Sequence, residues 1–534
     1  MHGIDARHRQ LTLVSSLRAG GVRHGWTSIG LAAAALVGAA MAGCRHADRP
    51  PAPTFSALFP PATGDLMTTS SPSLADLDGD GVADIVFGTG VDRTRPTGRR
   101  LQFTGEPAVS GYAVAVSGAT NRVLWQVPNP RDAFTTPRFL PLGTGPGTAR
   151  GTAVVMGGRE GVLTAYRGTD GTVLWRLLGE DVVTTPFPYY FLTPALIGDA
   201  NGDGVADLVV TYGGNDTRMP KEDRQQGYVL VVSGADGKVL ATRPVPDGAE
   251  TYASPVVYRR HDGTEWVVFG TGGESKPGAA YRAPVASLLD GTFATRAEQL
   301  VPTGTKGVIA PATVVELTGD GEPDLVVSTF DGRLVAIDGA TGKPLWQRAD
   351  ANEETYHAAT VVRLTAEGRL GLFVSRGIGA FPRYVGTVHR LHDAKDGRVL
   401  YEYRDPNYPA GAPLAVDLTG DGVDEPLFFT VRFPAAQGAR VHVLHLPTRR
   451  LAVHDVVDNL WSTPVVADPR RRGTLELIAL TWRADSGGTM ARPALSWHLE
   501  RLDLSAKTPA ARTWAGYLGT DTDGQYHVTP GGAR

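Results

Sequence analysis

The sequence predicts an all-β protein, an eight-bladed β-propeller of four-stranded antiparallel blades, with a seven-bladed ring as the alternative. Three observations lead to this prediction. The 534 residues include 66 Gly and 38 Pro, with 42% hydrophobic and 20% charged residues, a composition typical of a large, turn-rich β protein. A unit of about 48 to 64 residues recurs along the chain, which is the length of a propeller blade with insertions. Each unit also contains β-branched runs bounded by Gly and Asp turns.

The eight units begin in the same way. Each opens with a Thr-Pro or Ser-Pro pair, or an Ala-containing equivalent, and continues into a short apolar strand. The starts are at Ser71, Thr136, Thr193, Ser254, Ala310, Ala358, Ala412 and Thr463. The sequence therefore predicts a propeller domain over residues 71–505.

The second half of a unit is a hairpin, as in VSGATNRVLWQV and AIDGATGKPLWQR. A large ring recurs in the last strand of this hairpin, at Trp125, Trp175, Trp346 and Tyr401. Because one such ring occurs per blade, we expect it to dock each blade on the next.

An acidic loop lies between the first two strands of four units. It reads DLDGDGVAD at 76–84 and DANGDGVAD at 199–207, and it returns in weaker form at 316–324 and 417–425. Side-chain oxygens at positions 1, 3, 5 and 9, with Gly at position 6, are typical of a calcium-binding loop. The predicted calcium ligands, including position 7 of the first two loops, are Asp76, Asp78, Asp80, Val82, Asp84, Asp199, Asn201, Asp203, Val205, Asp207, Glu316, Asp320, Asp324, Asp417, Asp421 and Glu425.

An EF-hand is the obvious rival for these loops, but it needs a Glu at position 12 and a helix on each side. Position 12 is Phe87 in the first loop and Val210 in the second, and β-branched residues follow both loops. A bound ion would therefore brace a sheet. Simple Asp/Gly-rich turns are the alternative, and they remain open above all for the third and fourth loops, where Thr318 and Thr419 stand at position 3.

Two propeller families resemble this sequence. The loops at 76–84 and 199–207 resemble the FG-GAP or VCBS repeats of integrin α-subunits, and the segment 336–346 resembles the quinoprotein (PQQ-like) repeat. The resemblance implies a propeller fold, structural Ca²⁺ in the acidic loops and a ligand face opposite them. It implies little about activity, since one fold serves many functions.

The N-terminal region predicts export and lipidation. An apolar run over 29–43, after several Arg residues, reads as a signal peptide and leads to Cys44, the single cysteine of the chain. The stretch resembles the lipobox of bacterial lipoproteins, with Met41 in place of the usual Leu. A signal anchor is the alternative. We therefore expect a signal peptide over 1–43, a lipid-modified Cys44 with a Pro-rich linker over 44–70, and an exported protein anchored to the bacterial membrane at the cell surface or in the periplasm.

The ligand face is expected at the opposite end of the blades from the acidic loops. The longer insertions fall in the second connection of several blades, and five of the eight blades have an aromatic residue three positions before the first-strand Pro or its equivalent. These side chains could line the mouth of the central channel and suit a sugar, an amine or a peptide, although packing between blades would also explain them. The candidate residues are Phe134, Phe191, Tyr252, Tyr356 and Trp461, with carboxylates at Asp132, Glu250 and Glu354.

Three classes of function remain open. A calcium-stabilised, non-catalytic binding or scaffold protein at the cell envelope is favoured, with an unknown protein or glycan as its partner and no organic cofactor. A bacterial outer-membrane assembly lipoprotein with quinoprotein-like repeats and no cofactor is one such scaffold. A quinoprotein dehydrogenase and a calcium-dependent polysaccharide lyase are the alternatives, but no catalytic residue can be assigned.

Two further expectations complete the prediction. Residues 1–43 hold four Arg and one Asp, so the remainder has a formal charge of −6 against −3 for the whole chain, which argues against a nucleic-acid partner. Residues 506–534 form a C-terminal strand or tail that could close the ring, with 54–59 as another source of a closing strand.

Overall fold

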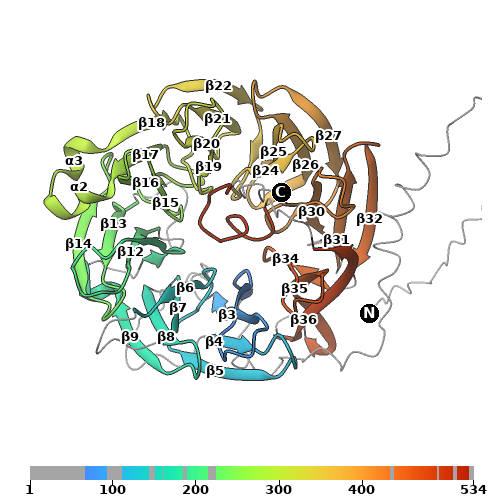
Figure 1. Ribbon diagram of the computed structural model, residues 1–534, viewed down its shortest axis with the longest axis horizontal. Coiled ribbons are helices and arrows are strands. Elements are labelled where there is room, and N and C mark those ends of the chain that lie inside the picture. Colours follow the sequence, from blue (N-terminus) through green and yellow to red (C-terminus); the bar gives the residue numbers. More distant parts are fainter. Residues whose placement is uncertain are drawn as a thin grey trace, which may run out of the picture.

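Eight antiparallel sheets stand around a central axis, so the predicted eight-bladed propeller is confirmed and the seven-bladed alternative is wrong (Figure 1). The computed structural model describes residues 66–92, 111–143, 151–159, 161–184, 189–214, 224–432, 438–456, 458–489, 492–508 and 514–527. The signal peptide, Cys44 and the segment 54–59 lie outside the described residues. Within those ranges no helix has the length and apolar character needed to cross a membrane.

The first four blades follow the chain in order. Blade 1 contains β1 (Leu66–Thr69), β2 (Ser73–Ala75), β3 (Asp84–Asp92), β4 (Gly111–Val116) and β5 (Val123–Asn129). Blade 2 contains β6 (Arg138–Pro141), β7 (Thr152–Gly157), β8 (Val162–Arg167) and β9 (Val173–Leu178). Blade 3 contains β10 (Tyr190–Phe191), β11 (Ala195–Ile197), β12 (Asp207–Gly213), β13 (Tyr228–Val232) and β14 (Val239–Pro244). Blade 4 contains β15 (Val256–Arg259), β16 (Glu265–Gly270), β17 (Ala279–Pro284) and β18 (Glu298–Pro302), with α2 (Val285–Asp290) and α3 (Phe293–Arg296) between its last two strands.

The last four blades complete the ring. Blade 5 contains β19 (Thr313–Val315), β20 (Asp324–Ser328), β21 (Arg333–Ile337) and β22 (Pro344–Ala349). Blade 6 contains β23 (Glu353–Glu354), β24 (Thr360–Arg363), β25 (Leu370–Ala380), β26 (Arg383–Asp393) and β27 (Val399–Asp405). Blade 7 contains β28 (Tyr408–Pro409), β29 (Leu414–Val416), β30 (Glu425–Val431), β31 (Ala439–His445) and β32 (Arg450–Val456). Blade 8 contains β33 (Asn459–Leu460), β34 (Val465–Ala467), β35 (Thr474–Thr489) and β36 (Arg492–Lys507).

The innermost strand of several blades is interrupted where the Pro-containing start of the repeat lies. In blade 3, β10 and β11 both pair with β12, and the interruption falls at Thr193-Pro194. Proline lacks the N–H that would continue the ladder, which accounts for the break. Blade 1 has the same arrangement, and its β1 lies in the stretch that the sequence assigned to the linker.

The core lies between the blades, as the recurring tryptophans predicted. The indole of Trp125 donates to the Gly168 carbonyl of the next blade at 2.6 Å, and Trp175 donates to Gly234 at 2.8 Å. Trp346 repeats the contact with Ala394 at 2.8 Å. The prediction that these rings dock one blade on the next is confirmed.

Blade 8 meets blade 1 through side chains and backbone. The amide of Thr463 donates to the Ser71 hydroxyl at 3.0 Å, and the Arg501 guanidinium donates to the Gly118 carbonyl at 2.6 Å. In the described part of the chain, β36 is the outermost strand of blade 8, and no strand from another blade pairs with it. Blades 8 and 1 are therefore joined by individual hydrogen bonds and not by a shared sheet.

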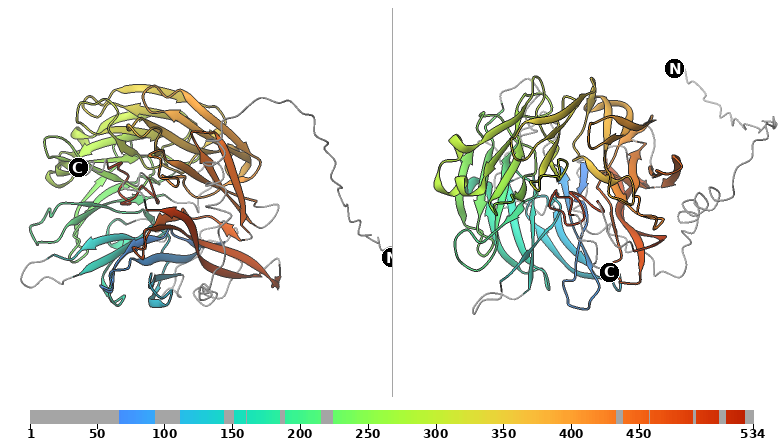
Figure 2. Two further views of the ribbon diagram at one scale, coloured as in Figure 1. Left: turned by 45° about the vertical axis from the view of Figure 1, so that its right-hand side comes forward. Right: turned by 45° about the horizontal axis from the view of Figure 1, so that its top comes forward.

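The C-terminal tail takes a position that the sequence did not predict. Residues 514–527, called the axial segment below, lie inside the ring of blades (Figures 1 and 2). Trp514 pairs with Ala415 of β29, Gln525 pairs with Val314 of β19, and the Val466 amide of β34 donates to Ala515 at 2.7 Å. The axial segment thus joins the innermost strands of three blades and does not extend β36.

Candidate functional site

Each acidic loop is closed by its first carboxylate. Asp76 accepts hydrogen bonds from the amides of Gly79 at 2.8 Å and Gly81 at 3.0 Å. Both glycines have positive φ, 79° and 84°, which favours Gly at these positions. Asp199, Glu316 and Asp417 close the other three loops through the equivalent amides. The four loops connect the first two strands of blades 1, 3, 5 and 7, as predicted.

The carboxylate at position 9 of each loop is buried and joins the loop to its sheet. Asp84 accepts from the amides of Leu77 at 2.9 Å and Gly118 at 3.1 Å. Burial raises the pKa of Asp84, and these backbone hydrogen bonds oppose the shift. In the fourth loop burial raises the pKa of Glu425 to about 8. Position 9 therefore has a structural role whether or not a cation is present.

The first loop fits a hard cation best. Oxygen atoms of Asp76, Asp78 and Asp84 approach one another within 4.8 Å, and no other acidic loop in the described ranges brings three carboxylates so close. Calcium takes six to eight oxygen ligands, so these carboxylates would need backbone oxygens or water to complete its shell. In the second loop the amide of Asn201 donates to Asp203 at 2.8 Å, which links two predicted ligands to each other.

Aromatic side chains gather where the innermost strands begin, at the end of the channel away from the acidic loops. Phe134 and Tyr252 flank Tyr190, with ring centroids 6.1 and 5.7 Å from it. A longer series runs from Phe330 through Tyr356, Phe381, Tyr384 and Tyr408 to Trp461, with successive centroids 4.8 to 6.3 Å apart. We call these nine residues the aromatic mouth.

The predicted aromatic set is shifted by one residue in blade 3. Phe191 is fully buried and its ring lies 4.5 Å from that of Tyr212, so it belongs to the core between blades. Tyr190, its neighbour on β10, takes the place in the mouth. Successive residues of a strand point to opposite sides, so a single-position offset exchanges the two roles.

Sequence reasoning missed Phe330, Phe381, Tyr384 and Tyr408. The second connection of blade 6 provides two of these, because the β25–β26 hairpin ends in a turn at Phe381. The Phe381 side chain is 47% exposed. The aromatic residues inside the insertion 377–386 were the available signal, but nothing in the sequence indicated that they lie beside Tyr356.

The three predicted carboxylates lie beside the aromatic rings, and each faces a cation. Asp132 pairs with Arg159 at 3.0 Å, and the Arg159 guanidinium also lies 4.2 Å from the Phe134 ring centroid. Glu354 pairs with Lys306 and accepts from the Tyr384 hydroxyl at 2.7 Å. These pairs come from second connections and blade-to-blade links, so both kinds of loop meet at the mouth as predicted.

Glu250 is the carboxylate of this group for which burial changes the pKa. It is 2% exposed, and its Oε2 lies 3.6 Å from a nitrogen of Arg224. Burial raises the pKa of Glu250 to about 7, and the positive charge of Arg224 opposes this shift. Nearby, the Tyr356 hydroxyl donates to Glu274 at 2.5 Å, and burial followed by the charge of Glu274 raises the Tyr356 pKa. The mouth therefore combines aromatic surface with charges of both signs.

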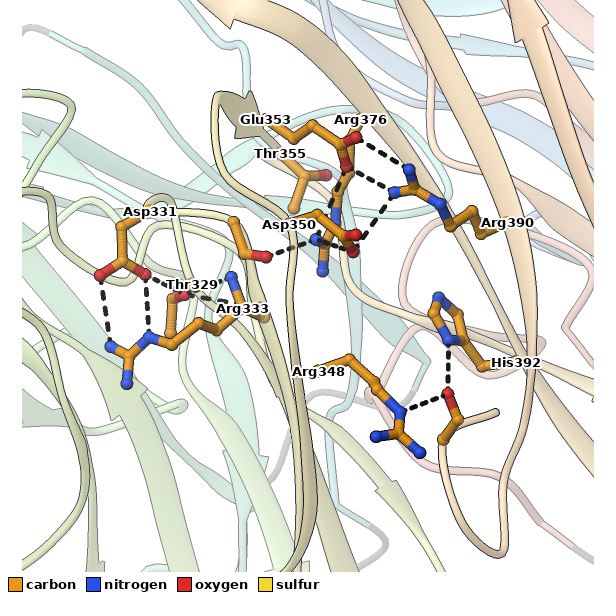
Figure 3. A network of polar contacts seen from close by, with 12 residues as sticks. Thr329, Asp331, Arg333, Arg348, Asp350, Glu353, Thr355, Arg376, Arg390 and His392 are labelled. Carbon is orange, nitrogen blue, oxygen red and sulfur yellow. Dashed lines mark hydrogen bonds and ion pairs between the residues drawn. The ribbon is translucent and has the colours of Figure 1, made fainter. Parts of the chain in front are cut away.

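A separate charged network joins blades 5 and 6 (Figure 3). Arg390 binds both oxygens of Glu353, at 2.6 and 2.9 Å, and the nearly buried Arg376 donates to the Gly332 carbonyl at 2.6 Å. Glu353 and Glu354 are adjacent on β23, yet Glu353 pairs with Arg390 in this network, whereas Glu354 contacts Tyr384 in the aromatic mouth. No sequence pattern indicated that these two neighbours have different roles.

His389 and His392 do not form a chelating pair on β26, and neither do His442 and His445 on β31. His389 and His442 lie on neighbouring blades with the Phe428 ring near both, and His442 stacks on it at 4.8 Å. His392 points away from His389 and contacts the Gly397 carbonyl at 2.9 Å. Burial lowers the pKa of His392 and of His442 to about 4, and Asp405 opposes the shift of His442.

Comparison with known families agrees with one of the two resemblances. Residues 109–193, which contain all of blade 2 and the last two strands of blade 1, match a family model described as PQQ_2, outer membrane protein assembly factor BamB. The chain is a propeller with PQQ-like repeats. No comparison bears on the FG-GAP resemblance, which remains a prediction.

Curated relatives of this PQQ-like propeller include mammalian proteins. Protein FAM234B of Mus musculus is 30% identical over 216 residues, which are 39% of this chain and 30% of the mouse protein. Protein FAM234A of Bos taurus is 24% identical over 388 residues, which are 67% of this chain and 62% of the bovine protein. The chain therefore spans less than two thirds of the length of either relative.

Similar solved structures include BamB from Moraxella catarrhalis, with 14% identity, a TM-score of 0.43, and coverage of 81% of this chain and 98% of that one. A quinohemoprotein alcohol dehydrogenase from Pseudomonas putida HK5 has 13% identity, a TM-score of 0.49, and coverage of 86% and 81%.

Proposed function

We propose that this protein is a non-catalytic binding or scaffold propeller of the cell envelope, exported and anchored through Cys44, which binds a glycan or a peptide segment at the aromatic mouth. The observation that carries the proposal is the aromatic mouth itself, a series of rings with buried charge pairs among them. Aromatic faces bind the C–H surfaces of sugars and apolar peptide side chains, and tyrosine adds a hydroxyl for hydrogen bonding.

The pairing of Asp132 and Glu354 with cations favours binding over catalysis at these two carboxylates. Asp132 and Glu354 are each held by a cation at short range, and Tyr384 also donates to Glu354. A carboxylate held in this way keeps its position, which suits recognition of a polar ligand. A general acid or base must instead be free to exchange a proton with substrate.

Structural Ca²⁺ in the acidic loops is part of the proposal. Asp76, Asp78 and Asp84 would hold it in blade 1, and Asp199, Asn201 and Asp203 would hold it in blade 3. The ion would neutralise the clustered carboxylates and fix the connection between the first two strands, at the end of the channel away from the ligand. It supplies rigidity in this proposal and takes part in no reaction.

The test is a binding screen with the lipid-free domain, on glycan arrays and peptide libraries. Phe381→Ser and Tyr252→Ser should each weaken a hit at least about tenfold, because truncated aromatic anchors at the centre of an interface commonly lose more than about 1.4 kcal/mol. Val399→Ser is the matched control, since Val399 is 45% exposed on the outer strand β27. Equal loss in all three variants, or no loss in any, would overturn the assignment of the mouth.

A quinoprotein dehydrogenase is the second candidate, and the PQQ-like match of blade 2 is the observation in its favour. Against it, the axial segment occupies the axis at the level of the innermost strands, where it contacts β19, β29 and β34. Reconstitution with pyrroloquinoline quinone and Ca²⁺, followed by a dye-linked oxidation assay, separates the two candidates. Turnover would support the dehydrogenase and contradict the proposal of a non-catalytic protein.

A further inference from the structure

Three side chains that can bind a metal converge in blade 8, in a part of the sequence separate from the four acidic loops. His498 and Glu500 lie two residues apart on β36, and Asp458 immediately precedes β33. One ligand atom from each lies within 4.8 Å of the other two. We infer that Asp458, His498 and Glu500 form a binding site for a divalent first-row transition metal such as Zn²⁺.

The strand pairing explains how these residues meet. β33 and β36 flank β35, with Leu460 and His498 both opposite Thr481. Residues directly opposite one another in a sheet point to the same side, as do residues two apart on one strand. Leu460 packs in the core cluster shared by blades 7 and 8, so this side of the sheet faces blade 7. Asp458 reaches His498 across β35 on that side.

Thr481 provides an independent observation. It lies directly opposite His498 on β35 and is 2% exposed, yet its hydroxyl has no hydrogen-bond partner among the residues that the structure describes. A buried hydroxyl without a partner is unfavourable by about 1–3 kcal/mol, so such groups usually mark a bound water or ion. Here the hydroxyl lies on the same side of the sheet as the three candidate ligands, where it could bind the metal or a metal-bound water.

The ligand chemistry selects the metal. One imidazole with two carboxylates is a common donor set for zinc and similar ions, which accept nitrogen, whereas Ca²⁺ and Mg²⁺ prefer oxygen ligands throughout. The acidic loops contain no histidine. The two kinds of site should therefore differ in selectivity, and a single protein could hold both types of ion.

A simpler interpretation is an ion pair without metal. His498 Nε2 lies 3.9 Å from Asp458 Oδ2, within the range of a weak salt bridge when the imidazole is protonated. An ion pair between Asp458 and His498 does not explain why Glu500 lies within 4.8 Å of both, or why the buried Thr481 hydroxyl lies on the same side of the sheet. It also predicts no response to added transition metal, which makes the two interpretations separable.

The test uses the full chain after its metals have been removed, with Co²⁺ as a spectroscopic probe and Zn²⁺ as competitor. We expect visible d–d absorption to saturate at one Co²⁺ per chain and to disappear when Zn²⁺ is added. His498→Gln and Glu500→Gln should each weaken Co²⁺ binding by about 10-fold to 100-fold or more. Loss of a residue that only supports a ligand already reduces metal affinity by about that factor, and loss of a ligand should reduce it at least as much. The exposed His261 provides the matched control, and His261→Gln should leave the titration unchanged.

Folding is checked on the same samples by circular dichroism and thermal melting. Zn²⁺ should raise the melting temperature of the parent chain and of His261→Gln, but not that of His498→Gln. Asp78→Asn in the first acidic loop should leave the Co²⁺ spectrum intact. Absence of d–d absorption in the folded parent chain, or its persistence in the folded His498→Gln variant, would overturn the inference.

Discussion

The indole nitrogen of Trp175 donates a 2.8 Å hydrogen bond to the carbonyl of Gly234, which belongs to the following blade. Trp125 and Trp346 make the same contact with their next blades. The ring covers apolar surface while its single polar atom finds a backbone acceptor, which is the arrangement that a buried tryptophan favours. The contact therefore acts at three blade junctions in the same way.

Trp175→Phe should destabilise the propeller by about 1–3 kcal/mol, because the Gly234 carbonyl loses its buried donor. Urea unfolding followed by circular dichroism measures this change. Tyr401→Phe is the control, since it alters only the hydroxyl at the equivalent strand position of blade 6. A Trp175→Phe variant as stable as the parent would show that the hydrogen bond contributes nothing net.

Gly237 should tolerate substitution less well than Gly248. Both have positive φ, 74° and 70°, so alanine is strained at either position. A Cβ at Gly237 would lie 2.6 Å from the Trp175 ring, whereas a Cβ at Gly248 meets no atom within 4 Å. The difference in unfolding free energy between Gly237→Ala and Gly248→Ala isolates the contact with Trp175. Equal losses in the two variants would contradict this explanation.

Removing Ca²⁺ should lower the melting temperature of the propeller, because an ion bound only by the folded state stabilises it by mass action. Asp78→Asn should reduce this response, since asparagine can still accept the 3.1 Å hydrogen bond from the Asp80 amide but removes one charge from the loop. Asp170→Asn, in the β8–β9 turn, is the control. A melting temperature that changes neither with the chelator nor with the Asp78 substitution would contradict calcium binding.

Acid should destabilise the interfaces around blade 6. Histidines of the unfolded chain take up protons near pH 6.5, whereas burial lowers the pKa of His392 and of His442 to about 4. At these two histidines the unfolded state binds more protons between these values, so their contribution to the free energy of unfolding falls as the pH is lowered from about 6.5 to 4. The raised pKa values of Glu250 and Glu425 contribute in the opposite direction, so the effect of the histidines is the difference in slope between the parent and the His392 variant. Urea titrations across this range measure the slope. His392→Asn should flatten it, whereas substitution of the exposed His261 should not.

Trp514→Ala should destabilise the propeller by about 3–5 kcal/mol, because the ring is fully buried and its removal leaves a cavity. Trp514 packs in a cluster that includes Phe373 and Phe428 of blades 6 and 7. Thermal melting measures the loss, and Gln525→Ala, at the other end of the axial segment, shows whether the whole segment matters. If Trp514→Ala melts like the parent, the axial segment does not contribute to stability.

The fold could be predicted from the sequence because each unit repeats a similar pattern of strands and turns. Thr-Pro, Ser-Pro or Ala-containing starts and Gly-rich turns recur in all eight units, and a docking aromatic ring recurs in four of them, so several weak signals reinforce one another. The acidic loops were placed correctly between the first two strands for the same reason. The predicted start of the propeller at residue 71 lies after β1 (Leu66–Thr69), because β1 precedes the Pro-containing segment that marked the start of the first unit.

The candidate site was predictable only in part, because its residues meet through loops of different blades. Tyr190 and Phe191 are adjacent and both aromatic, and only the register of β10 decides which one reaches the mouth. The adjacent carboxylates Glu353 and Glu354 present the same difficulty. Asp458, His498 and Glu500 share no motif, since they come together through the pairing of β35 with the strands on both of its sides.

The axial segment also affects how the protein is made. It follows all eight blades in the sequence, so the ribosome synthesises it after every strand that it contacts. Until then the innermost strands around the axis lack these backbone partners and expose edges to which other chains can pair. The propeller should therefore be most prone to aggregation in the interval before residues 514–527 have docked against β19, β29 and β34.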